Sequence, residues 1–269
     1  MKVILKKVFS NIIAGVRIVL CMLSLVICVP LLHVESMVLG YTAERGFKYR
    51  RMFTLFYIRI LNIRIKKEGF SGGRNTLYVC NHRMMIDPIV VLQYCNGYIV
   101  SKAEVANYPI LGSGAKHTGV IFVQRDQRDS RAAIKEEIGR LLKAGESVVI
   151  FPEGTVNTQA LTAAFSKGSF DEAAKYGCDV VPIALDYKDT GVYWSANISL
   201  IRHFLEVFKR WRLVTLICFG SPIKSNDGVE LMNKSREFID QKLHEMHLEW
   251  GAGVQKNYSG SSEMSISSK

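Results

Sequence analysis

The sequence predicts an α/β fold, with a largely buried sheet flanked by helices and preceded by N-terminal helices that associate with a membrane. After residue 62, short runs rich in β-branched and aromatic residues alternate with helical segments, which is typical of a covered sheet. Before residue 63, a long apolar segment is combined with basic residues. We therefore expect membrane-anchoring or interfacial helices over 1–62, a main domain over 63–250 and a serine-rich, disordered tail over 251–269.

The main domain contains several segments with the composition of strands. They are residues 63–69, 76–80, 97–102, 119–123, 147–151, 179–185 and 214–219. One amphipathic helix, expected to begin at Asp129 or Ser130 and to end at Gly145, is predicted by apolar residues at helical spacing. These residues are Ile134, Ile138, Leu141 and Leu142. A final helix is expected over about 229–250, with four inward-facing residues: Leu231, Ile239, Leu243 and Met246.

The net charge of +11 is concentrated at the N-terminal end of the chain. Residues 1–70 contain 12 Lys and Arg against 3 Asp and Glu. Because these basic residues are interspersed with apolar ones and no base-reading motif occurs, the pattern favours an anionic membrane surface over nucleic acid. The six cysteines are widely spaced and form no CxxC pair, which is typical of reduced, buried thiols in a region that faces the cytoplasm.

Residues 12–34 are apolar apart from Arg17, and the run after Arg17 has 17 residues, at the lower limit for a membrane span. The basic residues before it would keep the N-terminus in the cytoplasm. Pro30 could break this helix, so two arrangements stay open: a membrane-spanning helix and a hairpin that enters one leaflet. The next segment, 43–63, mixes arginines with aromatic and aliphatic residues. We expect it to form a helix in the headgroup layer, with an ordinary packed helix as the alternative.

A histidine and an aspartate lie where the strand predicted at 76–80 ends. Asp87 directly precedes Pro88, which is the position of a helix N-cap. The loop between them would also let the Asp87 carboxylate orient the His82 imidazole and stabilise its protonated form. The other ring nitrogen could then accept a proton from a hydroxyl or amine that attacks a carbonyl. Taken alone, the pair is also compatible with a loop histidine and a helix cap.

Three further positions stand out along the predicted strands. Arg125 comes just past one strand, where its guanidinium could bind a phosphate, with a surface ion pair as the alternative. Glu153 follows another strand, in a turn that Pro152 and Gly154 make irregular. Pro182 interrupts a third strand and predicts a sheet edge or a bulge. The chain contains no GxSxG motif, which favours direct attack by an acceptor over a covalent acyl-enzyme.

Four ordered blocks of the sequence resemble those of the lysophospholipid acyltransferase family, best known for the 1-acylglycerol-3-phosphate acyltransferases. The blocks are Asn81-His82-x4-Asp87, Gly119…Phe122…Arg125, Phe151-Pro152-Glu153-Gly154-Thr155 and Val181-Pro182. The similarity extends over about 77–187 and includes the connecting segment 101–114. Each block alone is a weak signal, whereas all four in this order and spacing are specific.

The resemblance implies a glycerolipid acyltransferase-like fold with a mixed sheet, and an acyltransferase catalytic domain over 63–250. It implies that His82 is the general base that deprotonates the acceptor hydroxyl and that Asp87 orients it. Pro182 would belong to the structural or acyl-binding wall. Substrate-binding roles would fall to Lys102, Arg125, Glu153, Gly154 and Thr155.

The implied reaction moves a fatty acyl group from an acyl-CoA or acyl carrier protein thioester to the free hydroxyl of 1-acyl-sn-glycerol-3-phosphate, a step of phospholipid biosynthesis. Because the thioester is already activated, the resemblance implies no metal or redox cofactor. The enzyme would be held at a membrane with its active site facing the cytoplasm, and in a bacterium this would be the inner membrane.

One position departs from the family pattern and leaves the acceptor open. Members that act on lysophosphatidate often have an arginine directly after the Phe-Pro-Glu-Gly-Thr block, where this chain has Val156. The loss of a bidentate phosphate donor favours other acceptors, such as a lysophospholipid with a headgroup or a lyso-aminolipid. Two alternatives come from other classes: a metal-dependent hydrolase and a non-catalytic lipid-binding homologue.

Three remaining features are interpreted as structural. His244 and His247 are three residues apart rather than the four of a HExxH zinc helix, so a solvated helix face is expected. The basic and aromatic segment 203–212 is interpreted as an amphipathic surface helix, with contact to lipid headgroups or to the donor as the alternative. His117 is interpreted as a structural histidine.

Overall fold

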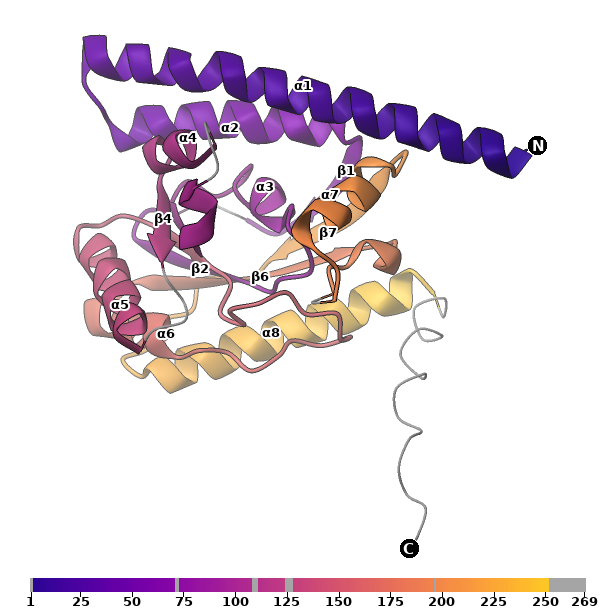
Figure 1. Cartoon of the computed structure of the whole chain (residues 1–269). Coiled ribbons are helices and arrows are strands. Elements are labelled where there is room, and N and C mark those ends of the chain that lie inside the picture. The colour runs from indigo at the N-terminus through magenta and orange to yellow at the C-terminus, as the bar shows by residue number, and fades with distance from the viewer. Residues whose placement is uncertain (1, 71–72, 108–110, 124–127, 196, 252–269) are drawn as a thin grey trace, which may run out of the picture.

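The computed structural model describes residues 2–70, 73–107, 111–123, 128–195 and 197–251 (Figure 1). In these residues a seven-stranded sheet has the order β1-β7-β6-β2-β5-β3-β4. The strands are β1 (Ile63–Glu68), β2 (Thr76–Cys80), β3 (Tyr98–Lys102), β4 (Val120–Val123), β5 (Val148–Ile150), β6 (Asp179–Tyr187) and β7 (Leu213–Phe219). All neighbours are parallel except β6 and β7. The strand prediction and the mixed sheet are confirmed.

Helices cover both faces of the sheet, which is why β2 and β6 are almost continuously apolar (Figure 1). One face packs against α1 (Lys2–Leu39), α2 (Ala43–Ile60), α3 (Asp87–Val91) and α7 (Leu200–Phe208). The other packs against α5 (Arg128–Lys143), α6 (Gly168–Tyr176) and α8 (Gly228–Glu249). The remaining helices are α4 (Leu111–His117), η1 (Ala103–Asn107) and η2 (Thr190–Val192). Along β2, Tyr78 and Cys80 belong to the first core, whereas Leu77 and Val79 belong to the second.

The two helices predicted from apolar spacing are both present. α5 ends at Lys143, and the chain then turns through Gly145, which has a positive φ of 78°. α8 begins after Asp227, whose side chain accepts a hydrogen bond from the N–H of Val229. Its four predicted inward residues are all buried: Leu231, Ile239, Leu243 and Met246. The spacing of apolar residues therefore located both helices and the faces that they bury.

Pro182 lies in the interior of the sheet, so the prediction of a sheet edge at this position is wrong. β6 pairs with β2 up to Ile183 and with β7 from Ile183 onward. Val180, two residues before the proline, donates its N–H to the carbonyl of Ile223 at 3.0 Å. The ring nitrogen of Pro182 faces this same side, between that bridge and the first pair with β7. No ladder N–H is required there, so the sheet tolerates the proline.

α1 runs without interruption from Lys2 to Leu39, so the helix break on which the hairpin alternative depends is not found at Pro30. A proline inside a helix removes one hydrogen bond, and packing on either side can hold the helix together. Val29 and Leu32 are both buried in this part of α1. The neighbouring helix α4 approaches closely, because a Cβ on Gly114 would lie 2.6 Å from Cγ2 of Val29. α4 therefore packs against α1 next to Pro30.

Arg17 fastens α1 to the end of α7. The residue is 7% exposed, and its guanidinium donates hydrogen bonds to the carbonyls of Phe208 (2.9 Å), Trp211 (3.2 Å) and Arg210. These carbonyls lie at the C-terminal end of α7, where backbone acceptors have no partner within the helix. The only charged residue of the long apolar segment is therefore used to join that segment to the sheet domain.

α1 and α2 form an antiparallel pair along one side of the molecule (Figure 1). Residues Ile4–Leu39 are long and apolar enough to cross a membrane by length and composition. Many apolar side chains of α1 are exposed: Ile12, Val16, Val19, Leu23, Val26, Ile27, Leu31 and Val34. α2 instead buries part of its polar face, since Arg50 is 5% exposed and donates to the carbonyl of Thr118 at 2.8 Å. The alternative of a packed helix therefore describes one face of α2.

Close packing of α2 on the sheet domain predicts opposite effects for two helical glycines. In Gly46→Ala the new Cβ would lie 2.2 Å from the carbonyl oxygen of His117, so overpacking should lower the free energy of unfolding by about 1–3 kcal/mol. In Gly15→Ala the new Cβ meets nothing within 4 Å, and the higher helix propensity should add up to about 1 kcal/mol. Denaturant unfolding of both variants in detergent micelles measures the difference. Equal effects at the two positions would show that α2 is not docked as described.

Candidate active site

His82 and Asp87 form a hydrogen-bonded pair just past the carboxyl end of β2. The Nδ1 atom of His82 lies 2.7 Å from Oδ2 of Asp87. The His82 side chain is 17% exposed, whereas that of Asp87 is fully buried. The His82 ring stacks on Phe151, with the ring centroids 4.4 Å apart. Among the described residues, Nε2 of His82 has no hydrogen-bond partner, so it presents a lone pair at the surface of the site once Nδ1 carries the proton.

The Asp87 carboxylate accepts four hydrogen bonds. Oδ2 receives the His82 ring and the backbone N–H groups of Arg83 (2.6 Å) and Met84 (2.8 Å), and Oδ1 receives the hydroxyl of Tyr187 at 2.8 Å. Burial and the nearby Asp87 charge hold the pKa of Tyr187 well above its usual range, so this phenol remains a donor. All four bonds hold the carboxylate in one orientation toward the imidazole.

The predicted N-cap role of Asp87 is wrong. Asp87 is the first residue of α3, and the preceding residue, Ile86, occupies the cap position without a side-chain hydrogen bond. The carboxylate turns back to the N–H groups of Arg83 and Met84, which belong to the loop before the helix. Because both oxygens are already occupied by the loop, the imidazole and Tyr187, the helix receives no cap from this side chain.

The backbone of His82 is held on both sides by the segment that follows β5. Its N–H donates to Oε1 of Glu153 at 2.9 Å, and its carbonyl accepts from the N–H of Asn157 at 2.8 Å. Oε2 of Glu153 accepts from the side chain of Asn157 at 2.9 Å and from the N–H of Ala163 at 2.8 Å. β2 and β5 are parallel neighbours, so the two strands end at the same edge and bring these residues together.

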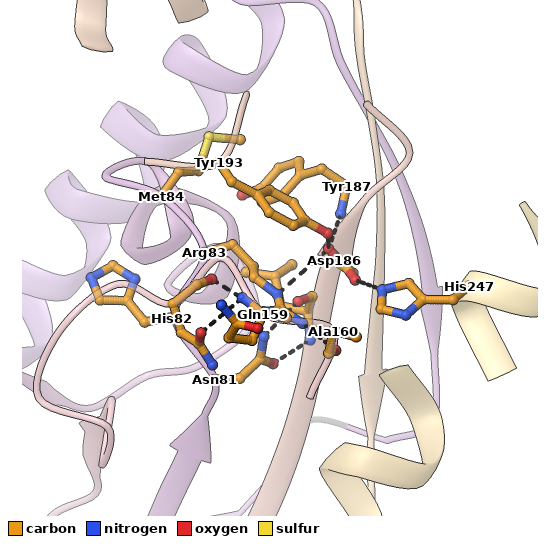
Figure 2. A network of polar contacts seen from close by, with 12 residues as sticks. Asn81, His82, Arg83, Met84, Gln159, Ala160, Asp186, Tyr187, Tyr193 and His247 are labelled. Atoms are coloured by element: carbon orange, nitrogen blue, oxygen red, sulfur yellow. Dashed lines mark hydrogen bonds and ion pairs between the residues drawn. The ribbon is translucent and has the colours of Figure 1, made fainter. Parts of the chain in front are cut away.

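The side chain of Asn81, directly after β2, makes hydrogen bonds to the backbone of β6 in place of a backbone pair between the two strands. It donates to the carbonyl of Leu185 and accepts from the N–H of Leu185, both at 2.8 Å, and the residue is 1% exposed. Figure 2 shows Asn81 and His82 side by side at this point. The asparagine of the motif thus fastens the catalytic loop to β6.

Cys80 lies two residues before His82 but is not placed to act as a nucleophile. The side chain is fully buried in the sheet. Burial and the neighbouring Asp87 charge raise the pKa of its thiol well above the usual range, so the thiolate is strongly disfavoured. Cys80 therefore contributes to the core.

The other predicted site residues lie at the same edge of the sheet, outside the described part of the chain or, for Pro182, in the interior of the sheet. Lys102 is the last residue of β3, and its side chain is not among the described ones. Arg125 lies outside the described residues, two positions after β4 ends. Gly154, with a φ of 71°, and Thr155 are exposed in the turn after β5. Pro182 lies opposite Val79 of β2, on the far side of that strand from β5.

The interpretation of His247 as part of a solvated helix face is wrong. Its Nε2 atom lies 2.6 Å from Oδ2 of Asp186, and its side chain is 12% exposed. Asp186 is fully buried, and its Oδ1 accepts from the hydroxyl of Tyr193 and from the N–H of Tyr187 at 2.8 Å. The buried cluster also contains Arg83, whose Nε lies 3.7 Å from Oδ1 of Asp186 (Figure 2).

The sequence reasoning missed this cluster, although one signal of it was present. Asp186 ends the apolar run of β6, and a carboxylate in a buried strand requires a partner. Two of its partners, Arg83 and His247, come from distant parts of the chain, and their separation from Asp186 carries no local pattern. For the described residues, no group of three or more His, Cys, Asp or Glu side chains is arranged to hold a metal ion.

The contacts of Glu153 predict a structural effect of its substitution. Glu153→Gln keeps one acceptor oxygen and places an amide NH2 against donors that now lack a partner. We expect the free energy of unfolding to fall by about 1–3 kcal/mol, together with a lower kcat. Denaturant unfolding and acyl-transfer kinetics measure the two effects, with the exposed Glu136→Gln as the matched control. A variant with unchanged stability and only a raised KM would instead support the predicted contact with the acceptor.

Comparison with known proteins places this chain in a family. The Acyltransferase family model matches residues 62–186. A lyso-ornithine lipid O-acyltransferase of Pseudomonas aeruginosa is 30% identical over 186 residues, covering 66% of this chain and 72% of that protein. A chloroplastic 1-acyl-sn-glycerol-3-phosphate acyltransferase of Arabidopsis thaliana is 33% identical over 149 residues, and the match covers 51% of this chain and 42% of that protein.

The fold is similar to a solved structure as well. The crystal structure of the 1-acyl-sn-glycerophosphate acyltransferase PlsC from Thermotoga maritima superposes with a TM-score of 0.70, at 19% identity, covering 90% of this chain and 97% of that chain. This likeness confirms the predicted α/β architecture, including its N-terminal helices. Together with the sequence matches, it confirms the resemblance on which the site was predicted, and the chain belongs to the acyltransferase family.

Proposed function

We propose that the protein transfers a fatty acyl group from a thioester donor to the free hydroxyl of 1-acyl-sn-glycerol-3-phosphate. The observation that carries this proposal is the His82–Asp87 pair, with Nδ1 bound to the carboxylate and Nε2 left for the acceptor. The relative from Arabidopsis thaliana is named for this acceptor. The donor would be acyl-CoA or acyl carrier protein, whose thioester is activated without a metal or redox cofactor.

The reaction follows from the geometry of the pair. Nε2 of His82 removes the proton from the acceptor hydroxyl as its oxygen attacks the thioester carbonyl. Asp87 stabilises the imidazolium that forms, because its carboxylate is held toward Nδ1 by three other hydrogen bonds. The tetrahedral intermediate then expels the thiolate, which takes the proton from Nε2. The products are the diacyl lipid and a free thiol, and His82 returns to its neutral form.

A second acceptor class is favoured by Val156. This residue stands directly after the Phe-Pro-Glu-Gly-Thr turn, where it supplies no positive charge for a phosphomonoester. The relative from Pseudomonas aeruginosa, which shares more of its length with this chain, is named for a lyso-ornithine lipid. A lyso-aminolipid is therefore the second candidate acceptor. The same His82 chemistry would acylate the hydroxyl of either lipid.

We place the enzyme at a membrane surface, with the exposed apolar face of α1 as the contact. The positively charged N-terminal residues Lys2, Lys6 and Lys7 favour anionic lipid and a cytoplasmic location for this end of the chain. Since Arg17 fastens α1 to α7, contact of α1 with lipid would also hold the sheet domain at the surface. The acceptor, itself a membrane lipid, would then reach His82 from that surface.

His82→Ala should lower kcat by at least about 100-fold, because general-base catalysis supplies gains of that size. The assay follows the release of free thiol from acyl-CoA and from acyl carrier protein, with purified protein in lipid vesicles. His244→Ala is the matched control, since His244 is an exposed histidine of α8. Near-wild-type turnover of His82→Ala would remove the proposed base. A wild-type protein that released no thiol with any lyso-lipid would instead be a lipid-binding homologue.

The same assay distinguishes the acceptors. Arg125→Ala should raise the apparent KM for 1-acyl-sn-glycerol-3-phosphate, because a guanidinium binds phosphate bidentately. It should leave the KM for a lyso-ornithine lipid, which has no phosphate, close to the wild-type value. Val156→Arg should lower the KM for the phosphate-bearing acceptor only. An unchanged KM in Arg125→Ala would exclude the phosphate-binding role of that residue.

A further inference from the structure

The residue after the catalytic histidine, Arg83, is a buried arginine that the reaction above does not use. The residue is 1% exposed, and its side chain is among the largest fully buried ones in the described part of the chain. A buried guanidinium requires hydrogen-bond acceptors and a counter-charge, because transfer of a charge out of water is costly. Both are present, and they connect three segments of the chain that lie far apart in sequence.

The guanidinium of Arg83 binds the loop that follows the Phe-Pro-Glu-Gly-Thr turn. Nη1 donates to the carbonyl of Asn157 at 3.1 Å and to that of Gln159, and Nη2 donates to the carbonyl of Ala160 at 2.8 Å (Figure 2). Three main-chain carbonyls thus converge on one side chain. A planar guanidinium with five N–H groups can serve all of them at once, whereas a lysine ammonium lacks this fork geometry.

The loop held by Arg83 is the one that holds His82. The N–H of Asn157 donates to the carbonyl of His82 at 2.8 Å, and its side chain donates to Glu153, which accepts the N–H of His82. The backbone N–H of Arg83 itself donates to Asp87. Arg83 therefore contacts both halves of the catalytic pair: Asp87 directly, and His82 through the loop at 157–160.

The counter-charge comes from β6 and is shared with α8. Oδ1 of Asp186 lies 3.7 Å from Nε of Arg83, and Oδ2 is bound by His247 at 2.6 Å. The ring of Tyr193 lies beneath the guanidinium, with its centroid 5.2 Å from Cζ. Asp186 and Tyr193 therefore hold the guanidinium in addition to the loop carbonyls. Arg83 and Asp186 are both fully buried, and each is held by more than one contact.

We propose that Arg83 is a positioning residue for acyl transfer, which sets the loop at 157–160 and thereby the backbone of His82. This inference rests on the proposed function. Arg83 is too buried to contact either substrate, so its loss should displace the base without removing a binding contact. The consequence is a change in kcat rather than in KM.

The test compares Arg83→Met and Arg83→Lys with Arg140→Met, an exposed arginine of α5 that is paired with Glu137. We expect kcat of Arg83→Met to fall about 100-fold, the loss typical of a reacting group misplaced by about 1 Å. Arg83→Lys should recover only a small part of this loss, because it keeps the charge but not the fork. The apparent KM for the acceptor should stay close to the wild-type value, and Arg140→Met should behave as the wild type.

Two further measurements separate positioning from a general loss of stability. Guanidinium ion at low millimolar concentration should restore part of kcat in Arg83→Gly, whereas ammonium should not. Amide hydrogen exchange should become faster in the segments 81–86 and 153–161 of Arg83→Lys, and stay unchanged in α5. The exchange measurement uses Arg83→Lys because this variant keeps a positive charge near Asp186. Arg83→Met removes that charge and can fail to fold.

The results that would overturn the inference are distinct. Wild-type kcat in Arg83→Lys, or a raised KM with unchanged kcat, would show that Arg83 does not position the base. Uniformly faster exchange through α5 would show a role in global stability only. If the wild type transfers no acyl group to any acceptor, the proposed function is wrong. The hydrogen-exchange rates of segments 81–86 and 153–161 in Arg83→Lys then still show whether Arg83 holds this loop.

Discussion

The hydrogen bond between His82 and Asp87 is the interaction on which the rest of the site depends. It selects the tautomer that exposes Nε2 and supplies the negative charge that a protonated imidazole requires. Asp87 can do this because two backbone N–H groups and the phenol of Tyr187 hold its carboxylate in the core. The imidazole is therefore oriented by buried groups, while its own side chain remains 17% exposed.

The parallel part of the sheet explains why residues from separate motifs meet at one edge. β2, β5, β3 and β4 run in the same direction, so the segments after them leave the sheet at their shared carboxyl end. His82 and Glu153 follow adjacent strands, and the backbone N–H of His82 donates to the carboxylate of Glu153. The antiparallel strand β7 continues the sheet on the far side, where it packs against β1 and β6 and carries none of the predicted site residues.

Local patterns in the sequence were sufficient for the strands, for two of the helices and for the pairing of His82 with Asp87. Each of these depends on residues close together, such as the continuous buried run of β2 or the short spacing of His82 and Asp87. The errors concern long-range contacts. Asp87, expected to cap a helix, instead accepts hydrogen bonds from the preceding loop and from Tyr187. His247, expected on a solvated helix face, instead binds the buried Asp186. Such partners are chosen by tertiary packing, which neither residue spacing nor propensity encodes.

The contact between Asp186 and His247 has a consequence for how the site is assembled. His247 lies in α8, far along the chain from the motif, so the charge cluster around Arg83 is incomplete until α8 has docked on β6. A chain that contains His82 and Asp87 but lacks α8 would therefore present the motif without the support behind it.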